Sequence, residues 1–155
     1  MIPTLILVFS TVFATAALAQ GAPGAPDAPA DITGTETGFT PIAADTVDLA
    51  SFLWASRPIV VFANTPADPA FAEQMRHLEA RWPELAARDV VVITDTDPAA
   101  ASAPRQKLRP RGFSVVLMEK DGTVVQRKPS PQDGRELIRM IDKMPIRREE
   151  MRAIR

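Results

Sequence analysis

The stretch IVVFANTPADP, residues 59–69, predicts a strand that leads directly into a helix. Its first part, Ile59 to Ala63, is continuously apolar and mostly β-branched, which is typical of a strand buried on both faces of a sheet. Its second part breaks this pattern. Asp68 followed by Pro69 is a favourable N-cap with a proline in the first helical turn.

A helix and a second buried strand are predicted to follow. Pro83 interrupts the helical pattern and predicts a kink or a short restart. Residues 89–94, DVVVIT, repeat the pattern of a buried strand, and a helix between two such strands favours parallel pairing in a right-handed βαβ unit. Apolar residues at spacings of three and four form one stripe along the helix; they are Phe71, Met75, Leu78, Trp82 and Leu85.

The next elements are a loop and a hairpin. Residues 95–110 are polar and contain proline, which predicts a loop with a short helix at Ala103 to Leu108. Asp121 and Gly122 lie between two runs rich in β-forming residues, 113–119 and 123–126. An Asp-Gly pair in this position is a strong hairpin pattern.

A last helix is predicted before Pro145. Ser130 is expected as its N-cap, with Pro131 in the first turn and Asp133 as the acidic N3 residue. The charged tail, residues 146–155, is expected to add one or two helical turns. The buried side of the last helix is expected to consist of Leu137, Ile138, Ile141 and Met144.

This order of elements is the order that thioredoxin-like domains use. The predicted fold class is α/β, a thioredoxin-like three-layer fold with a βαβ unit, a β-hairpin and a C-terminal helix. In thioredoxins and peroxiredoxins, the loop that corresponds to residues 64–69 carries the reactive cysteine at a helix N-terminus. This chain has no cysteine, so the fold is predicted without redox cysteines, and thiol exchange and thiol peroxidase chemistry are excluded. The proline that such folds carry before the third strand is also missing, since Arg111 and Gly112 precede Phe113.

The N-terminal part of the chain predicts export. Residues 1–19 are predicted to be a signal peptide, because Ile2 to Ala19 is uncharged and ends in a small-x-small pattern before Gln20. An uncleaved membrane anchor is the alternative, and it is the only contact with a membrane that we expect. Residues 20–48 are rich in Ala, Pro and Gly and are predicted to be a disordered linker. The folded domain is predicted over residues 49–152, in the periplasm or outside the cell.

Charge is distributed unevenly along the chain. The predicted linker contains five acidic residues and no basic one, whereas residues 101–155 contain 14 basic and 7 acidic side chains. This surplus could face an anionic partner. Nucleic acid is not expected, because an exported chain rarely meets it and no aromatic residues are interleaved with the charge.

The carboxyl ends of the predicted parallel strands are a second candidate site. Asn64, Thr65, Asp68 and Asp95 are expected there and would form a polar pocket. Asp68, Asp95 and Asp97 could together bind a hard cation, but helix capping and turns are the favoured roles for these aspartates. We therefore predict no metal site, no cofactor and no catalytic residue.

Three stretches resemble a known family: WASRPIVVF at residues 54–62, LMEKDG at 117–122 and IDKMPIRREEM at 141–151. They are similar to the DUDES-type domain of unknown function, a thioredoxin-like family of exported bacterial proteins and some animal matrix proteins. The resemblance extends over about residues 49–152. It implies a thioredoxin-like fold and no agreed activity. Arg57, Arg147 and Arg148 match its motif positions without a settled role.

Three functions are compatible with these patterns. The first is an exported, non-catalytic domain that binds an envelope protein or an anionic ligand. The second is a non-thiol enzyme with a polar site at the carboxyl ends of the strands, and the third is a structural envelope protein with a large exposed apolar patch. For the first function, the expected binding residues are Arg57, Arg147, Arg148 and Arg152, with Met144 and Met151 as adaptable apolar contacts.

Overall fold

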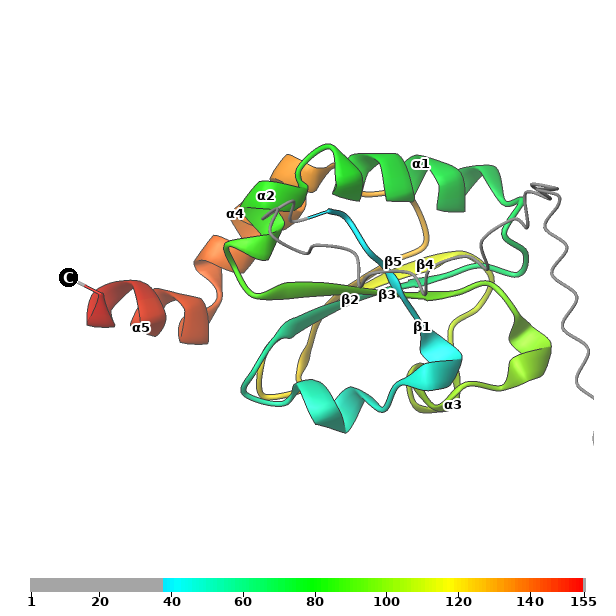
Figure 1. Ribbon diagram of the computed structural model, residues 1–155, viewed down its shortest axis with the longest axis horizontal. Coiled ribbons are helices and arrows are strands. Elements are labelled where there is room, and N and C mark those ends of the chain that lie inside the picture. The colour runs from blue at the N-terminus through cyan, green and yellow to red at the C-terminus, as the bar shows by residue number, and fades with distance from the viewer. Residues whose placement is uncertain (1–37, 155) are drawn as a thin grey trace, which may run out of the picture. The chain divides into compact units, whose positions relative to one another are not determined.

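A computed structural model describes residues 38–154 of the chain and shows a sheet between two layers of helices (Figure 1). The sheet has the strand order β1-β3-β2-β4-β5. β1, β2 and β3 pair in parallel, whereas β4 is antiparallel to β2 and β5 is antiparallel to β4. The predicted βαβ unit and hairpin are thus confirmed. The strands are β1 (Ile42–Ala43), β2 (Arg57–Phe62), β3 (Val90–Asp95), β4 (Ser114–Met118) and β5 (Val124–Lys128).

The helices cover both faces of the sheet. The longest ones, α1 and α4, lie with α2 on one face, and α3 lies on the other face with the short 3-10 helices η1 and η2 (Figure 1). α5 extends beyond the sheet at the C-terminal end of α4. The helices are α1 (Pro69–Glu79), α2 (Trp82–Ala86), α3 (Ala103–Leu108), α4 (Gly134–Lys143) and α5 (Pro145–Ala153), with η1 (Ala44–Thr46), η2 (Leu49–Phe52) and η3 (Pro98–Ala100).

Strand β2 is buried on both faces, as its continuous apolar run predicts. Ile59 and Val61 belong to the core beneath α1, α2 and α4, because alternate residues of a strand point to opposite faces. Val60 and Phe62 belong to the second core, beneath α3 and the 3-10 helices. All of these side chains are completely buried, so β2 is the central element of the domain.

The local helix signals are largely confirmed. The Asp68 carboxylate accepts a hydrogen bond from the Ala70 N–H, and Pro69 is the first residue of α1. The chain restarts a short helix at Trp82–Ala86, around Pro83, and α3 covers the predicted residues. The C-terminal tail forms the single helix α5.

The predicted start of α4 is wrong, because the helix begins later in the sequence than expected. Its N-cap is Asp133, whose carboxylate accepts from the Arg135 N–H, and not Ser130. The cause is a contact with α1: the amide of Gln74 accepts from the Gln132 N–H at 2.6 Å and donates to the Gln132 carbonyl at 3.2 Å. This pairing holds the residues before Asp133 along α1, so the helix begins later.

The predicted linker is too long at its C-terminal end. Ile42 pairs with Ile93 across β1 and β3, Ala44 is buried, and the Phe39 ring lies edge-on to Trp82 at 5.3 Å. These apolar contacts explain why residues 39–48 fold despite their composition. The predicted signal peptide and the earlier part of the linker lie outside the described residues. Within residues 38–154, no helix is long and apolar enough to cross a membrane.

Gly134 is expected to be required where α4 approaches α1. A Cβ atom at this position would lie 2.7 Å from the His77 carbonyl oxygen and 2.8 Å from Arg81 Cγ. We expect Gly134→Ala to lower the free energy of unfolding by about 1–3 kcal/mol through overpacking, although alanine favours helices by about 1 kcal/mol. Urea denaturation measures this change. Arg135→Ala, at the exposed next position, should change stability by less than about 0.5 kcal/mol, and a more stable Gly134→Ala would contradict the prediction.

Candidate functional site

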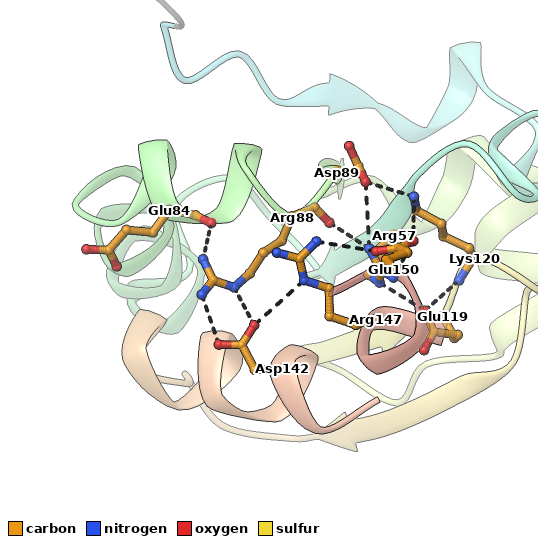
Figure 2. Close-up of polar contacts among 9 residues, drawn as sticks. All are labelled: Arg57, Glu84, Arg88, Asp89, Glu119, Lys120, Asp142, Arg147 and Glu150. Atoms are coloured by element: carbon orange, nitrogen blue, oxygen red, sulfur yellow. Dashed lines mark hydrogen bonds and ion pairs between the residues drawn. The ribbon is translucent and has the colours of Figure 1, made fainter. Parts of the chain in front are cut away.

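Arg57, the first residue of β2, is the centre of a buried ionic cluster (Figure 2). Its side chain is 0% exposed. The guanidinium donates from Nε to Glu119 Oε1, from Nη1 to the Arg88 carbonyl and from Nη2 to Glu150 Oε1, each at 2.9 Å. A buried charge is tolerated only when it is paired and hydrogen-bonded, and these contacts satisfy Arg57 from three separate segments.

A second set of ion pairs surrounds this centre. Lys120 Nζ lies 2.8 Å from Asp89 Oδ2 and 2.9 Å from Glu150 Oε1. Arg88 and Asp142 form a bidentate pair at 2.7 and 2.9 Å. The Arg57 cluster, as we name it, therefore connects the β4–β5 hairpin, the turn before β3, α4 and α5. Its members are Arg57, Arg88, Asp89, Glu119, Lys120, Asp142, Arg147 and Glu150.

Two acids of the Arg57 cluster, Glu150 and Asp142, are held in their charged forms. Burial alone would raise the pKa of Glu150, but hydrogen bonds from Lys120 and Arg57 outweigh it and lower this pKa to about 2. The hydrogen bond from Arg88 lowers the pKa of Asp142. Groups whose pKa is lowered in this way do not exchange protons near neutral pH, so Glu150 and Asp142 are suited to structural support and not to acid-base chemistry.

The expected binding arginines fall into two groups. Arg57 has no exposed surface to offer a partner, so the expectation that it contacts a ligand directly is corrected: its charge is used inside the domain. Arg147 is also engaged, with Nη1 3.3 Å from Glu150 Oε2. Arg148 and Arg152 are exposed, and neither has a carboxylate partner among residues 38–154.

A groove lies between the β4–β5 hairpin and the corner where α4 meets α5. It has a volume of about 320 Å³, and its walls are mostly apolar. Glu119 is one of its lining residues, and the Oε2 atom of Glu119 is buried with no hydrogen-bond partner among the described residues. The groove is lined by Glu119, Asp121, Thr123, Val125, Met140, Lys143, Met144, Pro145 and Ile146.

Trp54 is a surface feature that the residue patterns did not single out. Its side chain is 70% exposed and its backbone is left-handed, with φ of 62°. Its backbone N–H donates to the Lys120 carbonyl at 2.7 Å, which holds the Trp54 backbone beside the β4–β5 hairpin. The sequence could have indicated Trp54 through its position at the start of the WASRPIVVF stretch.

The expected polar pocket at the carboxyl ends of the strands has a different composition. A cavity of about 250 Å³ there includes Asp95 but is not lined by Asn64, Thr65 or Asp68, so the expected set is corrected. Asn64 and Thr65 are exposed, and Asp68 caps α1. The loop that contains them leads from β2 into α1.

Asp95 is occupied by its neighbours. Its carboxylate accepts from Arg105 Nη2 at 2.7 Å and from the Ser102 hydroxyl. Burial tends to raise the pKa of Asp95, but these hydrogen bonds lower it below its usual value. Asp97 caps η3, and the described residues contain no group of three or more acidic or histidine side chains that could hold a metal ion. Asp68 and Asp97 thus have the kind of role, in capping and turns, that the sequence favours.

Comparison with solved structures identifies the fold. Chloroplastic thioredoxin z matches with a TM-score of 0.53 and 17% identity over 68% of this chain and 94% of that one. A Plasmodium yoelii thioredoxin peroxidase I matches with a TM-score of 0.51 and 14% identity, covering 66% and 80% of the two chains. The reduced 2-Cys peroxiredoxin of Plasmodium vivax gives 0.51 and 12%, covering 68% and 85%. The chain therefore has a thioredoxin-like α/β fold, without cysteine.

The family follows from the sequence. Residues 48–150 match the family described as "Domain of unknown function (DUF4174)", and the chain belongs to that family. The search of curated proteins found no match. The predicted membership in a family of unknown function is confirmed at this level, whereas the solved structures show the fold alone.

Replacement of Arg57 should destabilise the domain strongly. Arg57→Met leaves Glu119 and Glu150 without their buried partner, and we expect a loss of about 3–5 kcal/mol in the free energy of unfolding by urea. The matched variant Arg148→Met, at an exposed position, should change it by less than about 0.5 kcal/mol. Arg57→Met with Glu119→Met should recover part of the loss. Equal effects of Arg57→Met and Arg148→Met would contradict the structural role.

The stability of the domain should depend on pH through Glu150. Its pKa is lowered from 4.5 to about 2 in the folded state, so its contribution is complete above the unfolded pKa and is lost as the pH falls toward about 2. Glu150→Gln should be less stable than the natural chain at neutral pH, and the two should converge at about pH 2. Glu149→Gln, at the exposed neighbouring residue, should retain the natural pH dependence. A difference in stability between Glu150→Gln and the natural chain that stays the same from neutral pH to about pH 2 would contradict this prediction.

Proposed function

We propose that this chain is an exported, non-catalytic thioredoxin-like domain that binds an acidic segment of a protein partner in the cell envelope. The observation that carries the proposal is the groove at the α4–α5 corner. Its walls include Val125, Met140, Met144 and Ile146, and its volume of about 320 Å³ suits an apolar side chain of a partner. Methionine-lined surfaces adapt readily to apolar side chains of different shape.

Positive charge on α4 and α5 favours an acidic partner. Lys143 lines the groove. On α5, Arg147 and Glu150 belong to the Arg57 cluster, so the exposed Arg148 and Arg152, one helical turn apart, lie on another face of the helix. The groove also contains two acids. Glu119 accepts a hydrogen bond from Arg57 Nε at 2.9 Å, and Asp121 accepts one from the Thr123 N–H at 2.8 Å.

Trp54 adds a second contact point for a protein. An exposed tryptophan in a fixed position can bury a large apolar area at low entropic cost, and tryptophan is enriched among residues that dominate interfaces. Because the Trp54 backbone N–H donates to the Lys120 carbonyl, the Trp54 backbone is held at the hairpin that also forms one wall of the groove. A protein segment across the hairpin could contact both features.

An enzymatic role is less well supported. The acid at the carboxyl ends of the strands, Asp95, is engaged by Arg105 and Ser102, which leaves it poorly suited to take up a proton. Export rests on the predicted signal peptide of residues 1–19. The stretches that resemble DUDES-type domains favour the same location, because that type occurs in exported proteins. Membership of this chain in that type is part of the proposal.

Selection of a random peptide library against the full chain tests the proposal. We expect enrichment of an apolar residue flanked by Asp or Glu. Arg148→Gln with Arg152→Gln should weaken the selected peptides about three- to tenfold, as expected for exposed charge pairs. Arg76→Gln, which removes an exposed charge from α1, should leave binding unchanged.

A second pair of variants localises the peptide. Val125→Glu places a carboxylate in the groove and should weaken acidic peptides at least tenfold, because a like charge meets them in an apolar setting. Val124→Glu alters the adjacent residue, which does not line the groove and is similarly exposed, at 40% against 43% for Val125. Equal effects of the two variants, or enrichment of basic peptides, would refute the proposed surface.

A further inference from the structure

A second concave site lies at the other end of β2 from the Arg57 cluster. Ser114, the first residue of β4, pairs with Phe62 at the last position of β2. It lines a cavity of about 290 Å³ together with Phe113 and three arginines, Arg109, Arg111 and Arg127. We name this site the arginine pocket. None of its residues lines the groove at the α4–α5 corner.

The backbone around the arginine pocket is built to bring its charges together. Arg105 anchors α3 by donating to the Ala63 carbonyl at 2.9 Å and to Asp95. Directly after α3, Arg109 adopts a left-handed conformation with φ of 48°, and Gly112 follows with φ of 64°. A left-handed arginine is strained, and such strain is often retained at functional sites.

The charges of the arginine pocket are not neutralised within the domain. No acidic residue lines the cavity, and Arg109, Arg111 and Arg127 have no ion pair among residues 38–154. By contrast, Arg57 and Arg105, which have structural roles, are paired with carboxylates. Three like charges around one small cavity repel one another unless an anion enters.

We propose that the arginine pocket binds a tetrahedral oxyanion, the phosphate or sulfate group of a small organic ester. Guanidinium groups match the oxygen atoms of such groups with paired hydrogen bonds. The Ser114 hydroxyl is a further donor, and the Phe113 ring offers an apolar wall for the body of the ester. The cavity is near the lower end of the sizes that hold small molecules, which favours a compact ligand over a polymer.

Calorimetric titration of the full chain with phenyl phosphate, phenyl sulfate and benzoate at low salt tests the proposal. We expect saturable binding of at least one tetrahedral ester at millimolar concentration or below, and weaker binding of benzoate. Tighter binding of the phosphate ester would assign the site to phosphate, and the reverse order would assign it to sulfate. No saturable binding of either ester, or equal binding of benzoate, would overturn the proposal.

Matched variants place the ligand. Arg111→Gln and Arg127→Gln should each weaken binding about tenfold, since a hydrogen bond to a charged group is lost. Arg76→Gln, which removes the same charge from the exposed face of α1, should retain full affinity. All three positions are exposed, and circular dichroism should confirm that the variants fold. Retained affinity in both Arg111→Gln and Arg127→Gln would overturn the assignment.

Discussion

The buried guanidinium of Arg57 is the constraint on which the arrangement of the domain depends. A charge with no exposed surface must be paired, and the partners of Arg57 lie 31, 62 and 93 positions away along the chain. The hairpin, the turn before β3 and α5 therefore have to meet at the first residue of β2. Removing one partner from such a buried cluster costs more than the cluster contributes as a whole, so its members act as one unit.

The position of α5 is the most important consequence for the surface. This helix has no buried residue of its own, and its ion pairs with the rest of the domain are made by Glu150 and Arg147. Because these charged contacts hold α5 at the end of α4, Ile146 can form part of the groove wall. The same contacts engage two of the charged residues of α5 and leave Arg148 and Arg152 exposed. A structural ion cluster thus determines which charges remain for a partner.

Local patterns in the sequence were sufficient for most of the fold, and contacts distant in sequence account for the rest. The Asp68 cap, the restart at Pro83 and the helix Ala103–Leu108 depend on neighbouring residues, so they could be predicted. β1 has only two residues and exists through its pairing with β3, and the start of α4 depends on Gln74 of α1. The basic surplus of the C-terminal part was visible as a count. A count does not show which arginines are already paired, and for that reason Arg57 was placed on the surface and the arginine pocket was not predicted.

The topology also explains why the arginine pocket occurs where it does. The end of β2, the start of β4 and the last part of β5 meet at one edge of the sheet because β4 is antiparallel to both of its neighbours. α3 is anchored to the same edge by Arg105, so the residues after it are brought there as well. The position of this edge is set by the strand connections. A chain without cysteine retains the concave edge, and the side chains that line it decide its chemistry. Here those side chains are guanidinium groups, which hold an anion by charge and hydrogen bonds and have no thiol to react with it.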